Sequence, residues 1–250
     1  MPHLSCATQD GHLFAIAEES TLLVHGGADE VPLFSRALSS PILALAASHA
    51  SLWALTEDGK LARFDRSGAL LGEVPVTVSP RAPCASRRAE VSVVVDAEGA
   101  WILRPESDKQ ALRVAGITTA ALSDKGDRLA LGTAEGKLLV YQVSDLSLTF
   151  ETTHDAAIRS LCPAGADFLL TAGDRVLLLE TASRELRRVT RAADYEPDLI
   201  AASGDGTVFA VRLDQETVMS LTVPPKDTVV QLIYPDKRPL GLAFVAGARL

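Results

Sequence analysis

The chain has 250 residues, of which 47% are hydrophobic, and its formal net charge at pH 7 is −8. This hydrophobic content is enough to bury a large core, and it excludes an intrinsically disordered or low-complexity protein. An acidic chain is a poor binder of nucleic acid on its own, because affinity for phosphate requires concentrated Lys and Arg.

The N-terminus, residues 1–12, has no basic stretch followed by an apolar run, so we expect no secretory signal peptide. The most apolar stretch, residues 41–55, is interrupted by polar residues and is too short to span a bilayer. A sparse, odd cysteine count without a C-x-x-C pair argues against a zinc finger and suits a reducing compartment; the cysteines are Cys6, Cys84 and Cys162. We therefore expect a location in the nucleus, the cytosol or both, with no membrane partner.

A short turn between two apolar segments of strand length recurs along the chain. Its second residue falls at positions 20, 59, 99, 136, 174 and 206, so successive turns lie 32 to 40 residues apart. Most of the turn pairs combine an acid with Gly, and Gly supplies the positive φ that a tight two-residue hairpin turn requires. The repeat predicts β-hairpins throughout; the pairs are Glu19-Ser20, Asp58-Gly59, Glu98-Gly99, Glu135-Gly136, Gly173-Asp174 and Asp205-Gly206.

The clearest unit contains four strand-like segments, at residues 117–122, 128–133, 137–143 and 148–152. Four short antiparallel strands in about 40 residues are typical of one blade of a β-propeller. We therefore predict an all-β fold in which residues 1–250 form a single propeller domain. About seven four-stranded blades are expected, with the last one incomplete.

The spacing also predicts where the blades begin and end. Six are expected at residues 4–38, 41–78, 81–115, 117–152, 157–191 and 194–223, and a partial seventh at 227–250. The sixth is short, and we expect it to lack its innermost strand.

Two segments leave alternatives open. In the partial seventh blade we expect strands at 228–234 and 240–245, with residues 4–8 available to complete it, because an open edge leaves backbone groups unpaired. Residues 181–194 allow either a helical turn or an outer strand, and their place in the fifth blade favours the strand.

Motifs for nucleotide binding or zinc-dependent hydrolysis, G-x-x-x-x-G-K-[ST] and H-E-x-x-H, are absent. The five histidines are scattered, and none pairs at metal-ligand spacing. A triad of Ser160, His154 and Asp174 could be assembled, but no nucleophile-elbow motif supports it. We expect no catalytic residue, no metal and no cofactor.

Basic clusters are the one charge feature that departs from the acidic background. They are either solvated edge strands, which charges commonly protect, or contacts to an acidic partner or an RNA backbone. One cluster lies near the first strand of the third blade, one on the outer strand of the fifth, and one beside the last strands. Their members are Arg81, Arg87 and Arg88; Arg184, Arg187, Arg188 and Arg191; and Lys226, Lys237 and Arg238.

The units resemble WD repeats. In the segment ALSDKGDRLALGTAEGKLLVYQV, residues 121–143, Tyr141-Gln142 stands where the Trp-Asp pair usually falls, and His154-Asp155 follows where the Gly-His pair usually falls. The resemblance covers nearly the whole chain, although no unit carries both pairs intact. It implies that His154 belongs to a structural hydrogen-bond network inside the blade, with Asp174 as its partner.

A closer resemblance is to the non-catalytic WD-repeat subunits of tRNA (guanine-N7-)-methyltransferase. It is carried by ILALAASHASLWALTEDGKLARFD, by VSVVVDAEGAWILR, by residues 121–154, by FLLTAGDRVLLLE and by VFAVRLDQET. Two positions depart from that family: Ala97 replaces a Lys, and Leu139 replaces a basic residue that pairs with the enzyme. Lys137 lies two residues earlier on the same strand face and is the expected substitute.

This resemblance implies a heterodimer with a catalytic methyltransferase subunit, which would carry the S-adenosylmethionine pocket and modify tRNA bound through the complex. Lys137 and Arg159 are the charges expected to contact that enzyme. Without the resemblance, the residues favour a general interaction scaffold, in ribosome assembly, trafficking or ubiquitin transfer. A propeller enzyme or ligand binder would need polar residues converging at the central channel, and the sequence shows no such set.

Overall fold

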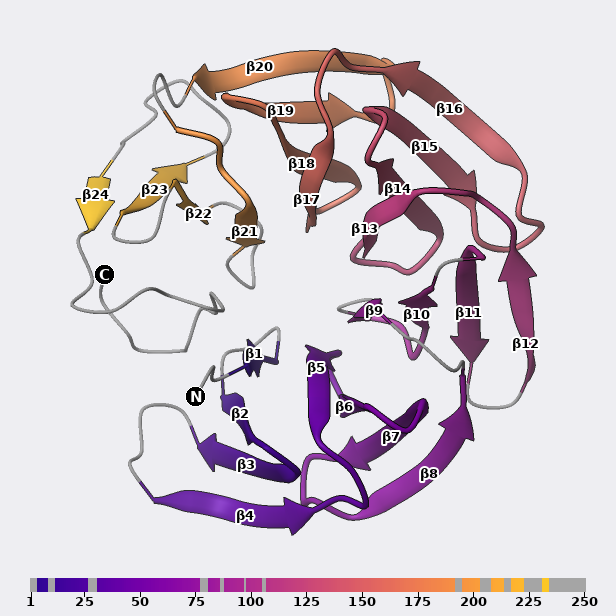
Figure 1. The fold of residues 1–250 in the computed structure, drawn as a ribbon, viewed down its shortest axis with the longest axis vertical. Helices are drawn as coiled ribbons and strands as arrows, with labels where there is room; N and C mark the ends of the chain where they lie inside the picture. Colours follow the sequence, from indigo (N-terminus) through magenta and orange to yellow (C-terminus); the bar gives the residue numbers. More distant parts are fainter. Residues whose placement is uncertain are drawn as a thin grey trace. The chain divides into compact units, whose positions relative to one another are not determined.

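In the residues that the computed structural model describes, β-strands form six antiparallel sheets of four strands each (Figure 1). We call these sheets blades 1 to 6. The chain divides into two compact units, residues 1–114 with 243–250 and residues 115–242, and each is described by itself. The structure describes residues 4–8, 12–26, 31–76, 81–85, 88–96, 98–104, 107–191, 195–202, 208–213, 217–222 and 231–233.

The first unit holds blades 1 to 3, and the strands of each blade pair in sequence order. Blade 1 consists of β1 (Leu4–Ala7), β2 (Leu13–Glu18), β3 (Thr21–Gly26) and β4 (Pro32–Ala37). Blade 2 consists of β5 (Ile42–Ala47), β6 (Ser51–Thr56), β7 (Lys60–Asp65) and β8 (Leu70–Pro75). Blade 3 consists of β9 (Arg81–Ala85), β10 (Ser92–Val95), β11 (Ala100–Arg104) and β12 (Ser107–Leu112).

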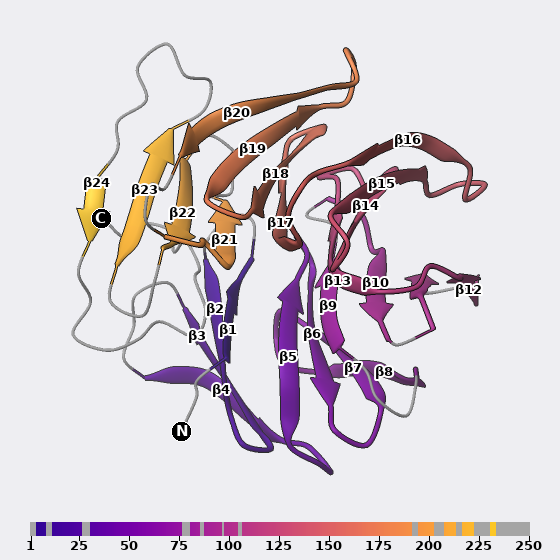
Figure 2. The ribbon, with the colours of Figure 1, turned by 45° about the horizontal axis from the view of Figure 1, so that its top comes forward.

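The second unit holds blades 4 to 6 in the same arrangement (Figure 2). Blade 4 consists of β13 (Ile117–Leu122), β14 (Arg128–Thr133), β15 (Lys137–Gln142) and β16 (Leu148–Thr153). Blade 5 consists of β17 (Ile158–Ala164), β18 (Asp167–Ala172), β19 (Arg175–Glu180) and β20 (Glu185–Arg191). Blade 6 consists of β21 (Leu199–Ala202), β22 (Val208–Arg212), β23 (Val218–Thr222) and β24 (Gln231–Ile233).

The predicted fold class is confirmed, and the number of blades is corrected from about seven to six in the described residues. β21 is the inner strand that the sixth blade was expected to lack, and β24, expected in a seventh blade, pairs with β23. Two consecutive prolines, Pro224 and Pro225, ended the expected sixth blade too early, because Pro cannot donate to a strand ladder. The strand expected at residues 240–245 lies outside the described residues.

Two further expectations are settled by strand pairing. β1 pairs with β2 inside blade 1, so the N-terminal segment does not complete a last blade as expected. The segment with two alternatives in blade 5 forms the outer strand β20, and the helical alternative is wrong. Leu186 and Val189 pack against two different hydrophobic clusters. A strand directs side chains to both faces of its sheet, which explains why a strand suits this sequence.

The recurring turns differ from the expected two-residue form in three blades. In blade 2 the connection is Glu57, Asp58 and Gly59, and the Gly59 amide donates to the Thr56 carbonyl over 3.0 Å. Gly59 has φ +78°, and Gly136 at the same place in blade 4 has φ +81°. This is a type I turn closed by a residue in the left-handed region, for which Gly is preferred. Blades 1 and 5 keep two-residue connections.

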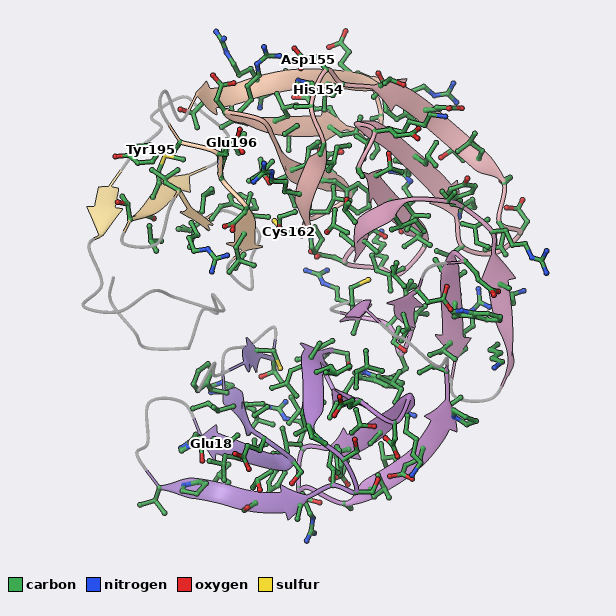
Figure 3. The ribbon with its side chains drawn as sticks, in the orientation of Figure 1. Glu18, His154, Asp155, Cys162, Tyr195 and Glu196 are labelled. Atoms are coloured by element: carbon green, nitrogen blue, oxygen red, sulfur yellow. The ribbon has the colours of Figure 1, made fainter. Side chains whose placement is uncertain are left out.

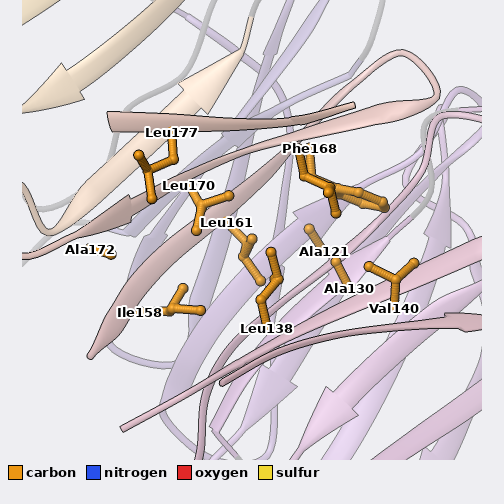
Figure 4. Packing of buried hydrophobic residues seen from close by; sticks show 11 residues of the cluster. Ala121, Ala130, Leu138, Val140, Ile158, Leu161, Phe168, Leu170, Ala172 and Leu177 are labelled. Atoms are coloured by element: carbon orange, nitrogen blue, oxygen red, sulfur yellow. The ribbon is translucent and has the colours of Figure 1, made fainter. Parts of the chain in front are cut away.

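Hydrophobic side chains pack between neighbouring blades within each unit. Figure 4 shows the cluster between blades 4 and 5, where Leu138 and Val140 of β15 meet Phe168 and Leu170 of β18. All four are almost completely buried. Strands that are covered on both faces read as continuous hydrophobic runs, which is why the sequence segments lack a strict alternation.

The turn of blade 2 predicts a specific response to acid. Asp58 accepts a hydrogen bond from Thr56 Oγ1 over 2.6 Å and pairs with Lys60 Nζ at 2.9 Å. These contacts, with Thr56 first, hold the pKa of Asp58 below its ordinary value of 3.8. The carboxylate therefore stabilises the fold at pH values above 3.8, and this contribution is lost as the pH falls through the lower pKa of the folded state.

We expect Asp58→Asn to lower the melting temperature at neutral pH. Below pH 4, the melting temperature of this variant should fall less steeply than that of the wild type. The control is Glu57→Gln, which removes a neighbouring exposed carboxylate without these contacts. Thermal melts between pH 2 and pH 7 measure both variants. Parallel curves for wild type and Asp58→Asn across that range would contradict the assignment.

Candidate protein-interaction surface

Lys137 and Arg159, the two charges expected to contact a partner, lie at the same end of blades 4 and 5. β15 begins at Lys137, which lies opposite Thr153, the last residue of β16. The chain then returns through residues 154–157 to begin β17, in which Arg159 is the second residue. The His154 amide donates to the Gly136 carbonyl over 2.8 Å, so the start of β15 lies beside this returning segment.

Lys137 is exposed at this end of blade 4. Its backbone amide donates to Thr133 Oγ1 over 3.0 Å, which fixes the start of the strand. Within the described part of the chain no carboxylate pairs with its ammonium group. Lys137 is therefore a cation that a partner could use without first breaking a contact.

Arg159 is also exposed, but it is already paired. Its guanidinium forms an ion pair with Glu196, whose side chain is 63% exposed. Tyr195, next to Glu196, is 39% exposed and is one of the few large exposed aromatic or aliphatic side chains among the described residues of the second unit (Figure 3). Of these side chains, Tyr and Arg are of types that are enriched at protein interfaces.

Sequence reasoning did not identify Tyr195 and Glu196. They lie in the connection before β21, just ahead of the buried Pro197. A proline after polar residues is a loop signal, and loops carry much of the binding function of a scaffold. That signal could have drawn attention to the segment, but only the structure brings Glu196 to Arg159.

His154 lies in a small polar cluster with Asp155, Asp174 and Arg175 (Figure 3 labels the first two). Arg175 Nη1 lies 3.0 Å from His154 Nε2, and because a guanidinium can only donate, Nε2 must accept. The proton of a neutral ring is then on Nδ1, which donates to Asp155 Oδ1 over 2.8 Å. The 3.2 Å approach of the Ala156 amide to Nδ1 is the weaker contact, because this tautomer leaves Nδ1 no lone pair to offer.

Arg175 connects the two residues for which the resemblance implied a direct hydrogen bond. It lies 3.0 Å from His154 and 3.5 Å from Asp174 Oδ1. The cluster is partly open to solvent, since the side chains of Asp155 and Asp174 are 69% and 25% exposed. The side chain of His154 is 11% exposed, so the cluster lies at the boundary between the core and the surface at this end of blade 5.

Of the three basic clusters expected to contact RNA or an acidic partner, the one made of Lys226, Lys237 and Arg238 lies outside the described residues. The other two are distributed differently. Arg81 is the first residue of β9, Arg88 is exposed, and Arg87 lies outside the described residues. On β20, Arg187 donates to Glu180 over 2.7 Å, whereas Arg188 is exposed. Adjacent strand residues face opposite sides of a sheet, so Arg187 and Arg188 do not form one patch on a single face.

A second polar cluster, in the first unit, joins blade 2 to the segment that leads into β10. Glu90 accepts hydrogen bonds from Ser51 Oγ at 2.7 Å and from Ser48 Oγ at 3.0 Å. Arg63 donates to Glu90 at 2.7 Å, and its guanidinium lies 5.3 Å from the centre of the Trp53 ring. Because Ser48 and Ser51 are fully buried, this cluster is a structural connection between neighbouring blades.

Three features of the described residues bear on other kinds of site. They contain no group of three or more His, Cys, Asp and Glu side chains able to hold a metal ion. No helix in them is long and apolar enough to cross a membrane. A cavity of about 50 Å³ beside Trp101, lined also by Leu112 and Arg113, is far smaller than the several hundred Å³ of ordinary substrate pockets.

Comparisons with known proteins identify the fold. No protein-family model matches the sequence, and no curated protein matches it. Among solved structures, the β-propeller domain of Cps50 (Swd1) from Myceliophteria thermophila is 14% identical with a TM-score of 0.78, over 94% of this chain and 86% of that one. A chain of the Mitotic Checkpoint Complex and the WD40 repeats of RRP9 are each 13% identical with a TM-score of 0.70. They cover 83% and 85% of this chain, and 73% of their own length.

Identities this low carry information about the fold and not about partners or activity. The agreement extends over nearly the whole chain, and the paired strands reproduce the four-stranded antiparallel blade in every sheet. The chain therefore adopts an all-β propeller fold of the WD40 type.

Proposed function

We propose that this chain is a non-catalytic scaffold that holds protein partners, and that its contact surface is the end of blades 4 and 5. The observation that carries the proposal is the exposed set formed by Lys137, Tyr195 and the pair Arg159–Glu196. Tyr and Arg are the side chains most often found at the energetic centres of interfaces. The fold agrees with this role, since one of the similar propellers is named as part of the Mitotic Checkpoint Complex.

The proposed partner is the catalytic subunit of a tRNA (guanine-N7-)-methyltransferase. The support for this partner is the resemblance of five sequence segments, which include residues 121–154 with Lys137. In such a heterodimer the enzyme supplies the catalytic chemistry, and this chain holds the enzyme and helps to place tRNA. Arg81, Arg87 and Arg88 are the proposed tRNA contacts, and the proposed location is the nucleus, the cytosol or both.

The double variant Lys137→Glu with Arg159→Glu is expected to weaken binding of the methyltransferase by at least about tenfold, because like charges facing each other across an interface are strongly unfavourable. Folding should be retained, since exposed ion pairs such as Arg159–Glu196 contribute little to stability. Calorimetric titration of the purified proteins measures the affinity. The matched control is Lys125→Glu with Arg113→Glu, the same charge change at two other exposed positions.

Two outcomes separate the broad proposal from the named partner. A folded chain that neither binds the methyltransferase nor raises its activity would exclude that partner and leave the general scaffold. Equal loss of binding in the control variant would instead show a dependence on net charge, and it would remove the end of blades 4 and 5 as the contact surface.

A further inference from the structure

The outer strand of blade 5 differs in charge from the other outer strands. β20 and the residue before it carry Arg184, Arg187, Arg188 and Arg191 against Glu185. Among the other outer strands, β4 carries only Arg36, which donates to the Gly68 carbonyl over 3.0 Å. β8 and β16 each carry one Glu, β12 carries one Asp and one Lys, and β24 is uncharged. In a chain of net charge −8 this concentration requires an explanation.

β20 also offers a free strand edge. It pairs with β19 on one side and with no strand of the described residues on the other, so one row of its backbone groups is available for hydrogen bonding. The register shifts at Val189, between the partners of Val176 and Leu177. A bulge of this kind ends regular pairing. The regular edge is therefore the stretch from Glu185 to Arg188.

Two exposed arginines bracket that regular edge. Arg187 is ion-paired with Glu180, but Arg184 and Arg188 are exposed, and neither guanidinium has an ion pair within the part of the chain that the structure describes. They are four residues apart, which in a strand corresponds to at most about 13 Å. Carboxylates at that spacing on a second strand could meet both.

Arg184 is held in an unusual backbone conformation. Its φ is +60°, in the left-handed region that disfavours any residue with a Cβ. In the corresponding turns of blades 2 and 4 the residues with positive φ are Gly68 and Leu146. This backbone conformation recurs in these turns, and in blade 5 it places Arg184 directly ahead of Glu185, where the regular edge begins.

We propose that β20 binds an extended acidic peptide segment of a partner protein, which adds as a fifth strand to blade 5. The peptide backbone pairs with Glu185–Arg188, and carboxylates about four residues apart contact Arg184 and Arg188. Strand addition is an established mode of peptide recognition, in which the edge supplies affinity and flanking side chains supply specificity. RNA fits less well, because a phosphate backbone cannot continue the strand pairing.

The test uses a fluorescein-labelled peptide of alternating Val and Thr with two Glu residues four positions apart, and a matched peptide with Gln in place of Glu. Fluorescence anisotropy with the full chain measures the affinity. We expect the Glu peptide to bind at least about tenfold more tightly than the Gln peptide, and Arg188→Glu to remove that difference. Lys125→Glu, the same charge change elsewhere, should leave binding unchanged.

Arg184→Gly separates recognition from folding. It should weaken peptide binding about threefold while raising the melting temperature by about 2 °C, because Gly relieves the strained φ. The double variant Lys137→Glu with Arg159→Glu should still bind the peptide, which keeps this test independent of the proposed function. Equal affinity for the two peptides, no effect of either β20 variant, or tighter binding of an oligouridylate that the same variants abolish would overturn the proposal.

Discussion

Replacing Gly136 by alanine is expected to lower the free energy of unfolding by about 3–5 kcal/mol. A Cβ there would lie 2.2 Å from the carbonyl oxygen of His154 and 2.7 Å from that of Ala156. Relief of this overlap requires the backbone to move, which breaks the 2.8 Å hydrogen bond from the His154 amide to the Gly136 carbonyl. The φ of +81° adds the strain of an L-residue in the left-handed region.

Gly116→Ala is the matched control, because Gly116 has φ +70° and no atom lies within 4 Å of the position that its Cβ would take. This variant carries the backbone strain alone, about 1–2 kcal/mol. Urea unfolding of both variants measures the difference. Equal losses would show that the turn of blade 4 does not press against the returning segment as the structure has it.

Replacing Glu90 by alanine is expected to cost about 2–4 kcal/mol. The variant leaves the buried hydroxyl of Ser51 without its acceptor, leaves that of Ser48 with only the Ser51 carbonyl at 3.4 Å, and leaves Arg63 without its counter-ion. The side chains of Arg63 and Glu90 are 20% and 29% exposed, which places the expected cost below that of a fully buried ion pair.

Glu98→Ala serves as the control for Glu90, since it removes an exposed carboxylate in the same blade and should change stability by about 0.5 kcal/mol or less. The loss of stability in Glu90→Gln should fall between those of Glu90→Ala and Glu98→Ala, because the amide keeps an acceptor for one serine and loses the charge. Urea unfolding distinguishes these outcomes. A Glu90→Ala variant as stable as Glu98→Ala would contradict the role of Glu90 as the link between blades 2 and 3.

The fold could be predicted from the sequence because its information is local and repeated. Each blade is marked by a turn with a Gly or an acid at a fixed place between two apolar segments. The spacing of these turns predicted the positions of five of the six blades. The prediction failed where a local signal competed. Pro224 and Pro225 hid the fourth strand of blade 6, and the turns of blades 2 to 4 are longer than the expected two residues.

The contacts of the site could not be predicted, because they join residues distant in sequence. Arg159 meets Glu196 across 37 positions, and Ser48 meets Glu90 across 42. Arg175, which connects His154 to Asp174, is adjacent to Asp174 in sequence, yet only the packing of the returning segment against the turn shows its role. Composition could place arginines on β20, but the φ of Arg184 is visible only in the structure.

The most direct test of the scaffold proposal is size-exclusion chromatography with light scattering on the chain mixed with the purified methyltransferase subunit at 0.15 M salt. The proposal predicts one complex of the two proteins in equal amounts, formed by the wild type and by Lys125→Glu with Arg113→Glu. It predicts loss of that complex for Lys137→Glu with Arg159→Glu, with an unchanged melting temperature. A folded wild-type chain that elutes alone at its own mass of 26.5 kDa would contradict the proposed partner, and a complex that survives the double variant would contradict the proposed surface.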